Sequence, residues 1–223
     1  MRTYSEADIR DVALIGHGGA GKTSLGEAIL YDTKSVTRLG RVDEESSNLD
    51  TEPEEKKRKG TINPHVAAVE WQKTKINFID TSGQGDFLVD TLVAIGAADS
   101  AVCVVSASDG VQVYTEKTWE QANERGLPRI VFINKMDRER ADFNTALEQV
   151  VRTLSDKAVP VALPIGQEAG FAGVVDLVTT QPVHQPRRLH EAGIGQLRLQ
   201  HVGAARRELV GVVVESDRLR TQS

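Results

Sequence analysis

A phosphate-binding loop is predicted near the N-terminus by the spacing of glycines before a lysine and a threonine. The segment reads Gly16-His17-Gly18-Gly19-Ala20-Gly21-Lys22-Thr23, which fits G-x-x-x-x-G-K-[ST]. It follows an apolar run at 12–15 and opens a stretch that is expected to be helical. Because glycines let backbone N–H groups approach phosphates, we expect Lys22 to reach the β- and γ-phosphates and Thr23 to bind Mg²⁺. The motif predicts a nucleotide-binding fold but does not select the base.

An acidic group ends the apolar run at 75–80. This group is Asp80, and it is followed by Thr81, Ser82 and Gly83. A carboxylate at the end of a strand, beside a glycine turn, suits a residue that holds Mg²⁺ through water, and the Gly83 N–H can then contact the γ-phosphate. The D-x-x-G pattern is weak alone, but its place after the phosphate-binding loop makes it a strong indication.

A base-reading group is predicted at the end of the run 129–133. The segment there is Asn134-Lys135-Met136-Asp137. Its last carboxylate can accept two hydrogen bonds from the N1–H and N2–H₂ edge of guanine, whereas adenine lacks that pair of donors. Asp137 therefore argues against an ATP-driven enzyme. We expect GTP and GDP as ligands, with Asn134, Lys135 and Asp137 at the base.

A long polar segment, 32–64, follows the first expected helix and is of the kind that usually carries a function. It contains Thr61, a candidate second hydroxyl ligand of Mg²⁺ that binds only when GTP orders the loop. The basic run at 56–59 leaves two interpretations open: contact with RNA phosphates, or a solvated loop balanced by neighbouring glutamates.

These groups must be positioned by alternating short apolar runs and amphipathic stretches, which are typical of βαβ units. We expect strands at 12–15, 66–71, 75–80, 101–105 and 129–133, and helices at 22–30, 87–96, 115–125 and 142–154. In the helix 87–96, Leu88, Leu92 and Ile95 should form the buried face. Short strands at 159–163 and 173–178 indicate a different module. The predicted fold class is α/β, a P-loop NTPase domain with a mostly parallel sheet.

The composition narrows the possible partners. Hydrophobic residues make up 39% of the chain and aromatic residues 4%, which suits a parallel sheet covered by helices. The net charge is −5, so we expect no DNA partner, and any RNA contact must come from local basic patches. No segment approaches transmembrane length and the N-terminus lacks an apolar signal region, so we expect no membrane contact and a cytoplasmic location. Cys103 lies in an apolar run and is expected to be a buried thiol.

Together, these segments resemble the G domain of translational GTPases, most closely the elongation factor G family with its elongation-factor-G-like branch. The resemblance rests on residues 16–25, 80–87, 110–123, 128–143, 160–166 and 171–178. It implies Mg²⁺-dependent GTP hydrolysis, stimulated by the ribosome and its rRNA, in elongation or ribosome recycling. It also implies three parts: an N-terminal extension at 1–8, an incomplete G domain at 9–157, and part of an inserted subdomain with an atypical tail at 158–223.

The sequence departs from that family at several positions. Gln84 stands where the family has a catalytic histidine. A glutamine can orient an attacking water, so Gln84, with Lys22 and Thr61, is a candidate catalytic residue. Gly19 stands where an acidic residue is common, and Thr61 lies in K-G-T-I and not in R-G-I-T-I. Gln84 and Gly19 favour the alternative of a non-catalytic guanine-nucleotide-binding remnant.

The sequence ends before the last strand, the S-A-x base loop and the closing helix of the family's G domain. We therefore expect a truncated gene product in which the strand 129–133 is an exposed sheet edge, and thus an aggregation liability. The lysine-free, arginine-rich tail from residue 180 suggests a shifted reading frame around 184–203. Sequencing the coding DNA tests that hypothesis.

Overall fold

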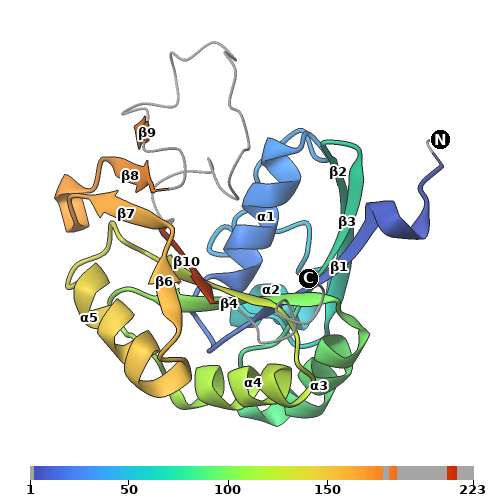
Figure 1. The fold of residues 1–223 in the computed structure, drawn as a ribbon. Helices are drawn as coiled ribbons and strands as arrows, with labels where there is room; N and C mark the ends of the chain where they lie inside the picture. The colour runs from blue at the N-terminus through green and yellow to red at the C-terminus, as the bar shows by residue number, and fades with distance from the viewer. Residues whose placement is uncertain (1–2, 178–180, 185–209, 215–223) are drawn as a thin grey trace.

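The computed structural model describes residues 3–177, 181–184 and 210–214. It contains a seven-stranded sheet in the order β2-β3-β1-β4-β5-β10-β6 and a three-stranded sheet in the order β7-β8-β9 (Figure 1). The larger sheet is built from β1 (Ile9–Ile15), β2 (His65–Trp71), β3 (Thr74–Asp80), β4 (Ser100–Ser106), β5 (Arg129–Asn134), β6 (Ala158–Pro160) and β10 (Val210–Val214). The smaller is built from β7 (Ala162–Ile165), β8 (Gly173–Asp176) and β9 (Gln181–His184).

Helices cover the larger sheet on both faces. The described helices are α1 (Lys22–Asp32), α2 (Pro53–Arg58), α3 (Leu88–Ala97), α4 (Val113–Glu124) and α5 (Phe143–Gln149), with short turns η1 (Glu6–Asp8), η2 (Gly85–Phe87), η3 (Val150–Leu154) and η4 (Glu168–Gly170). In Figure 1, α1 lies on one side of the sheet, and α3, α4 and α5 lie on the other. None of the described helices is both long enough and apolar enough to cross a bilayer.

The centre of the sheet is parallel. Strand β1 pairs in parallel with β3 and β4, and β4 pairs in parallel with β5. The carboxyl ends of these four strands therefore lie at one edge of the sheet, and the predicted phosphate, metal and base motifs follow three of them. The predicted α/β fold with a mostly parallel sheet is confirmed.

Alternate residues of the central strands fill two cores. Leu14, Phe78 and Val104 pack on the side of α1, whereas Ile15, Cys103 and their neighbours pack on the side of α3, α4 and α5. The prediction that the Cys103 thiol is buried is confirmed, and burial raises its pKa to about 12. The period of two along each strand explains how one buried sheet supplies both cores.

Several predicted elements differ in detail. The polar segment 32–64 contains a short helix, α2, which begins with a proline and a reciprocal capping box between Glu52 and Glu55. The expected helix 142–154 changes from α5 to the π-helical turn η3. In α3, Ile95 is buried, but Leu88 and Leu92 are only half-buried, because Thr91 and Ala94 lie on the inner face.

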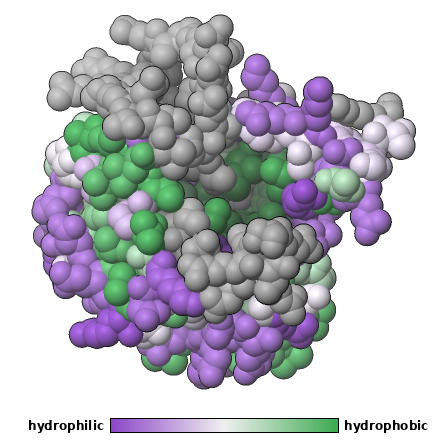
Figure 2. Space-filling view, viewed as in Figure 1, coloured by the Kyte–Doolittle hydropathy of each residue, from purple (hydrophilic) through white to green (hydrophobic). Residues whose placement is uncertain are grey.

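The single strand expected at 159–163 is divided between the two sheets. Pro160 lacks an N–H donor and ends β6, while β7 begins at Ala162 in the smaller sheet. Exposed Val159, Leu163 and Leu177 belong to this region, where apolar atoms gather over β6 to β8 in Figure 2. The expected strand 173–178 is β8, and Val178 lies outside the described residues.

The prediction that the strand 129–133 is an exposed edge is wrong. Strand β10 pairs antiparallel with β5 over five residues, and β6 pairs antiparallel with the outer side of β10. The backbone groups of β5 are therefore hydrogen-bonded on both sides, although this neighbour runs opposite to the central strands. The reading-frame hypothesis concerns 184–203, of which all but His184 lies outside the described residues.

Candidate nucleotide-binding site

The predicted phosphate-binding loop connects β1 to α1 and is shaped by positions that only glycine tolerates. Gly16 and Gly21 have φ values of 129° and 100°. A Cβ atom on Gly16 would run into the carbonyl of Val104, and one on Gly21 would run into the side-chain amide of Asn134. The loop therefore lies against two neighbouring strands at the edge where the parallel strands end.

Lys22 is the cation of this loop. Its side chain is 5% exposed, and its Nζ donates to the carbonyl oxygens of Gly16 and His17 at 2.9 and 3.0 Å. Burial lowers the pKa of Lys22 to about 8, although nearby Asp80 favours the charged form. The ammonium group is thus held at the loop, where a bound phosphate would compensate for the hydration that burial has removed.

Three oxygen-bearing side chains meet beside Lys22. The Thr23 and Thr61 hydroxyls lie 2.9 Å apart, and the Thr61 hydroxyl is 3.3 Å from Asp80 Oδ2. Asp80 is fully buried at the end of β3, and this burial raises its pKa to about 6 despite Lys22. The structure thus brings together the three side chains that the sequence proposes around Mg²⁺, from the first helix, the polar segment and the second motif.

The D-x-x-G turn contacts the phosphate-binding loop directly. The N–H of Gly18 donates to the carbonyl of Gly83 at 2.8 Å, and a Cβ atom on Gly83 would collide with Gly18 and with Lys22 Nζ. The exposed side chain of Gln84 lies close to Gly18 on one side and to Gly60 on the other. Gln84 is therefore at the junction of the phosphate-binding loop and the polar segment.

The predicted guanine-reading residues follow β5. Asn134 Nδ2 donates to the carbonyl of Ala20 at 2.9 Å, which joins this motif to the phosphate-binding loop. Lys135 has a left-handed backbone with φ of 63° and is half-buried. Among the described residues, no donor reaches Asn134 Oδ1 or Asp137 Oδ1, although both oxygens are buried. Buried acceptors of this kind call for a ligand or water that donates hydrogen bonds.

The polar segment, here residues 33–64, carries buried carboxylate contacts that the sequence analysis missed. Asp50 Oδ1 accepts from the Thr61 hydroxyl at 3.0 Å. Glu27 of α1 accepts hydrogen bonds from three consecutive residues of the segment, which are Ser47, Asn48 and Leu49. The available signal was a set of acidic residues in α1 and the segment, but nothing in their spacing separates the buried ones from the exposed ones.

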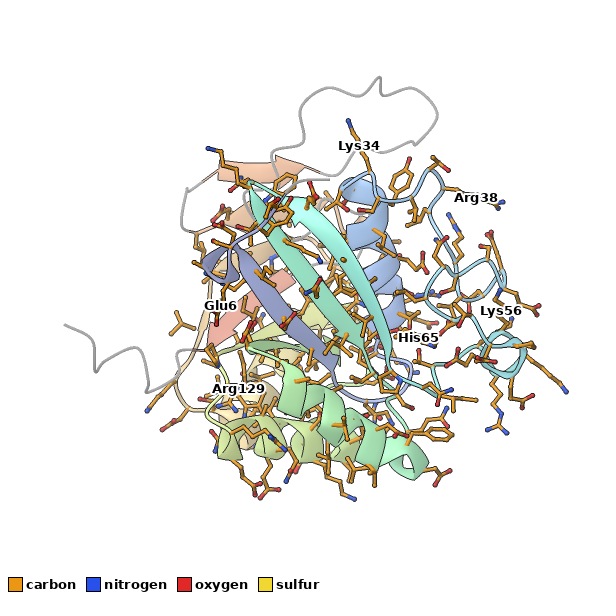
Figure 3. The ribbon with its side chains drawn as sticks, turned by 90° about the vertical axis from the view of Figure 1, so that its right-hand side faces the viewer. Glu6, Lys34, Arg38, Lys56, His65 and Arg129 are labelled. Atoms are coloured by element: carbon orange, nitrogen blue, oxygen red, sulfur yellow. The ribbon has the colours of Figure 1, made fainter. Side chains whose placement is uncertain are left out.

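The basic run 56–59 is largely on the surface. Arg58 pairs with Glu54 at 2.7 Å, in a salt bridge whose partners are both about half exposed. Figure 3 shows that the polar segment lies outside the sheet and that Lys34 and Arg38 extend from it toward solvent. These observations agree with a solvated, partly balanced loop and leave contact with RNA as a prediction.

Comparison with known proteins places this geometry in a family. Residues 7–215 match the family model described as the elongation factor Tu GTP binding domain. A crystal structure of a protein from Thermus thermophilus superposes with a TM-score of 0.76 at 38% sequence identity. The match covers 81% of this chain and 27% of that protein, so this chain spans about a quarter of its length. The chain belongs to the family of elongation factor Tu-type GTP-binding domains.

Proposed function

We propose that this chain binds guanine nucleotide together with Mg²⁺ and hydrolyses GTP to GDP and phosphate. One observation supports this most strongly: Thr23, Thr61 and Asp80 meet beside the buried Lys22, although they come from three separate segments. Two hydroxyls and a carboxylate, next to a lysine and a glycine loop, are the groups that a nucleoside triphosphate and its magnesium ion require.

The residues present fit Mg²⁺. The ion prefers oxygen ligands, and this cluster offers only oxygens. Among the described residues, no hydrogen-bond donor reaches the buried Asp80 Oδ1, so this oxygen is available to a cation or to its water. We assign Thr23 and Thr61 as direct ligands and Asp80 as a ligand through water. When bound, the ion neutralises charge on the β- and γ-phosphates.

The chain's own residues would position the remaining groups. The backbone N–H groups of Gly16 to Thr23 and the Lys22 ammonium would hold the phosphates, and the Gly83 N–H would contact the γ-phosphate. Gln84, which lies between Gly18 and Gly60, would orient the attacking water. Catalysis would then rest on positioning and charge neutralisation, without a covalent intermediate.

We assign base recognition to the residues after β5. Asp137 would accept from the N1–H and N2–H₂ groups of guanine through its carboxylate, of which Oδ1 is buried without a donor in the described part of the chain. Asn134 and Lys135 would flank the base, and Asn134 would also keep the base site attached to the phosphate-binding loop through Ala20. A site built on an acceptor carboxylate discriminates strongly against adenine.

Family membership supports a role in translation, so we propose the ribosome and its rRNA as partner and the cytoplasm as location. Within the family, resemblance to elongation factor G favours a step in elongation or ribosome recycling. We further propose that 9–157 form the nucleotide-binding unit, after an extension at 1–8, and that 158–223 belong to a partial inserted subdomain and tail.

A non-catalytic guanine-nucleotide-binding module is the second candidate. It is favoured by Gln84, which stands where the elongation factor G family has a catalytic histidine, and by Gly19, which stands where an acidic residue is common. Hydrolysis of radiolabelled GTP, measured with and without ribosomes, separates the two candidates, because only the enzyme releases phosphate.

The first experiment is titration of the chain with fluorescent GDP in Mg²⁺ buffer, competed with GTP, ATP and xanthosine diphosphate. We expect displacement by GTP but not by ATP. An Asp137→Asn variant should lose GDP affinity and gain affinity for xanthosine diphosphate, because its amide donates where guanine also donates and xanthine accepts. Equal displacement by ATP and GTP would overturn the assignment of guanine specificity.

A further inference from the structure

Glu55 is a buried carboxylate that lies inside the polar segment. It belongs to α2, where its neighbour Glu54 is exposed, yet its own side chain is fully buried. Burial raises the pKa of Glu55, but hydrogen bonds from Ile62, His65 and Asn63 outweigh it and leave the pKa below its ordinary value. The carboxylate is therefore held as an ionised hydrogen-bond acceptor.

The donors to Glu55 surround Thr61 in the sequence. Glu55 Oε1 accepts from the N–H groups of Ile62 and Asn63 at 2.8 and 3.0 Å. The N–H of Gly60 donates to the backbone carbonyl of Glu55 at 3.1 Å. The residue before Thr61 and the two residues after it are thus attached to Glu55, and this fixes the direction in which the Thr61 side chain points.

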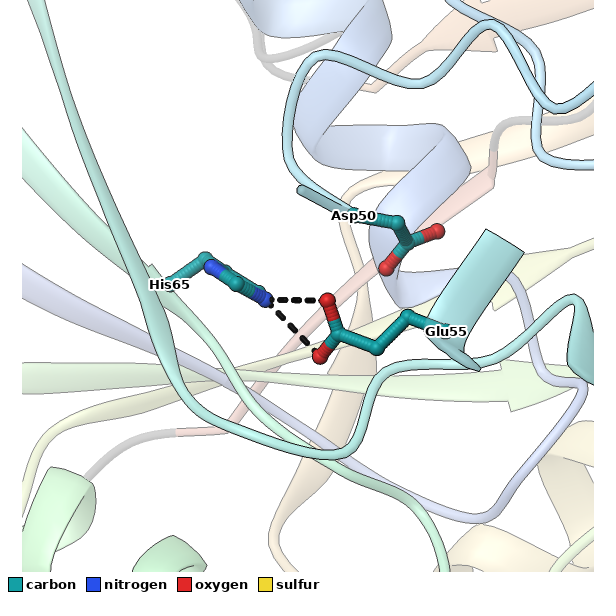
Figure 4. Close-up of side chains that lie close together, drawn as sticks. All are labelled: Asp50, Glu55 and His65. Carbon is teal, nitrogen blue, oxygen red and sulfur yellow. Dashed lines mark hydrogen bonds and ion pairs between the residues drawn. The ribbon is translucent and has the colours of Figure 1, made fainter. Parts of the chain in front are cut away.

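His65 attaches Glu55 to the sheet. Its Nε2 lies 2.9 and 2.8 Å from the two carboxylate oxygens, as the close-up in Figure 4 shows. His65 is the first residue of β2 and is paired in register with Asp80 of β3. The contact therefore connects Glu55 to the pair of strands β2 and β3, of which β3 carries Asp80. The same strand pair thus supports both Thr61 and Asp80.

Hydrogen bonding accounts for this cluster without an additional ion. Asp50, Glu55 and His65 each offer a possible ligand atom, and these atoms lie within 4.8 Å of one another. However, both Glu55 oxygens already accept hydrogen bonds, including one from the Glu52 N–H. The trio is better understood as the support of Thr61, since Asp50 also accepts from the Thr61 hydroxyl.

We propose that Glu55, held by His65, is a positioning residue that presents the Thr61 hydroxyl to Thr23 and Asp80. The inference rests on the proposed function, because Thr61 binds the metal only in the GTP state. Groups that orient a metal ligand from behind change metal affinity or activity about 10- to 100-fold when they are removed. Loss of Glu55 should therefore weaken GTP relative to GDP and leave GDP binding nearly unchanged.

The test compares Glu55→Ala with Glu54→Ala, which removes the adjacent, exposed carboxylate of the same helix. Affinities for a non-hydrolysable GTP analogue and for GDP are measured in Mg²⁺ buffer. The affinity for the GTP analogue divided by the affinity for GDP should fall about tenfold or more in Glu55→Ala. In Glu54→Ala this ratio should stay at the parent value. Among the His65 variants, His65→Gln should retain more of the ratio than His65→Leu, because only glutamine can still donate to Glu55.

Hydrogen–deuterium exchange of residues 60–65, measured without nucleotide, gives a second readout. Exchange there should accelerate in Glu55→Ala but not in Glu54→Ala. If Glu55→Ala does not fold, the same comparison is made with Glu55→Gln and Glu54→Gln. Unchanged exchange and an unchanged affinity ratio would overturn the proposal. A parent chain that binds no guanine nucleotide would refute the proposed function instead, and exchange alone would then decide the role of Glu55.

Discussion

The phosphate-binding loop and the polar segment 33–64 both deliver side chains to the cluster of Thr23, Thr61 and Asp80, but different contacts hold them in place. The loop is fixed mainly by its backbone, through glycines that lie against Val104, Asn134 and Gly83. The segment is fixed by buried carboxylates, Glu27 from α1 and Glu55 from α2.

This difference suggests a division of roles. A loop built from backbone contacts at the ends of buried strands is supported by the packed core on several sides, so it suits a permanent phosphate site. A segment held by a few side-chain hydrogen bonds can be released by small changes in free energy, which suits a part that responds to the nucleotide. Changes in the loop should therefore weaken GDP binding, whereas changes in the carboxylates should lower the order and stability of the segment and leave GDP binding nearly unchanged.

The largest effect is expected for Lys22→Ala in the loop. Removal of a buried charge partner of the phosphates should weaken GDP binding by about 4 kcal/mol, roughly 1000-fold. The free energy of unfolding of the nucleotide-free chain should not fall, because a buried charge is removed while the backbone contacts remain. Fluorescent GDP titration and urea unfolding measure the two quantities, with Lys117→Ala on the exposed face of α4 as control. A Lys22→Ala variant with a lower free energy of unfolding but the GDP affinity of the parent would contradict this division of roles.

Glu27→Ala tests how the polar segment is held in place. It leaves the buried donors of Ser47 and Leu49, and the part-buried N–H of Asn48, without their acceptor, so we expect a loss of about 3 kcal/mol in the free energy of unfolding. Limited proteolysis should also begin within residues 33–60. Glu120→Ala, an exposed glutamate of α4, serves as the matched control. Equal stability and equal protease resistance of the two variants would show that Glu27 does not hold the segment.

Gln84 lies where the phosphate-binding loop meets the polar segment, so Gln84→Ala tests whether their junction serves hydrolysis rather than binding. We expect the rate of GTP hydrolysis to fall about 100-fold with little change in GDP affinity, because the side chain would orient water and touch no phosphate. Single-turnover experiments measure the rate of GTP hydrolysis, and titration with fluorescent GDP measures the GDP affinity. Phosphate release at the parent rate would remove the catalytic role given to Gln84.

The smallest effect concerns the pH dependence of binding by the loop. Burial lowers the pKa of Lys22 from 10.5 to about 8, so above pH 8 the folded chain loses a proton that the unfolded chain keeps up to about 10.5. Folding of the nucleotide-free chain therefore becomes more favourable as pH rises across this range. Phosphate favours the charged amine, so GDP affinity without Mg²⁺ should fall by up to about tenfold between pH 8 and about pH 9, where the guanine N1–H is still protonated. In Lys22→Arg, which stays charged, affinity should hold constant over that range.

The sequence by itself determined the fold class and the family, and it placed the candidate nucleotide-binding motifs in order. The phosphate-binding loop, Asp80 and the Asn134 to Asp137 motif are local patterns, and each follows an apolar run long enough to be a buried strand. Because parallel strands place their carboxyl ends at one edge, their convergence followed from local information alone. Thr61 stays a predicted ligand, and the structure brings its hydroxyl beside Thr23 and Asp80.

Only the tertiary structure decided which carboxylates are buried and which strand covers β5. Glu54 and Glu55 are adjacent in the sequence, yet one faces solvent and the other accepts hydrogen bonds from residues up to ten positions away. Strand β10 joins β5 across more than 70 residues, and β6 separates from β7 at a proline. None of these contacts has a sequence period, because each depends on where distant segments pack rather than on the repeat of a helix or a strand.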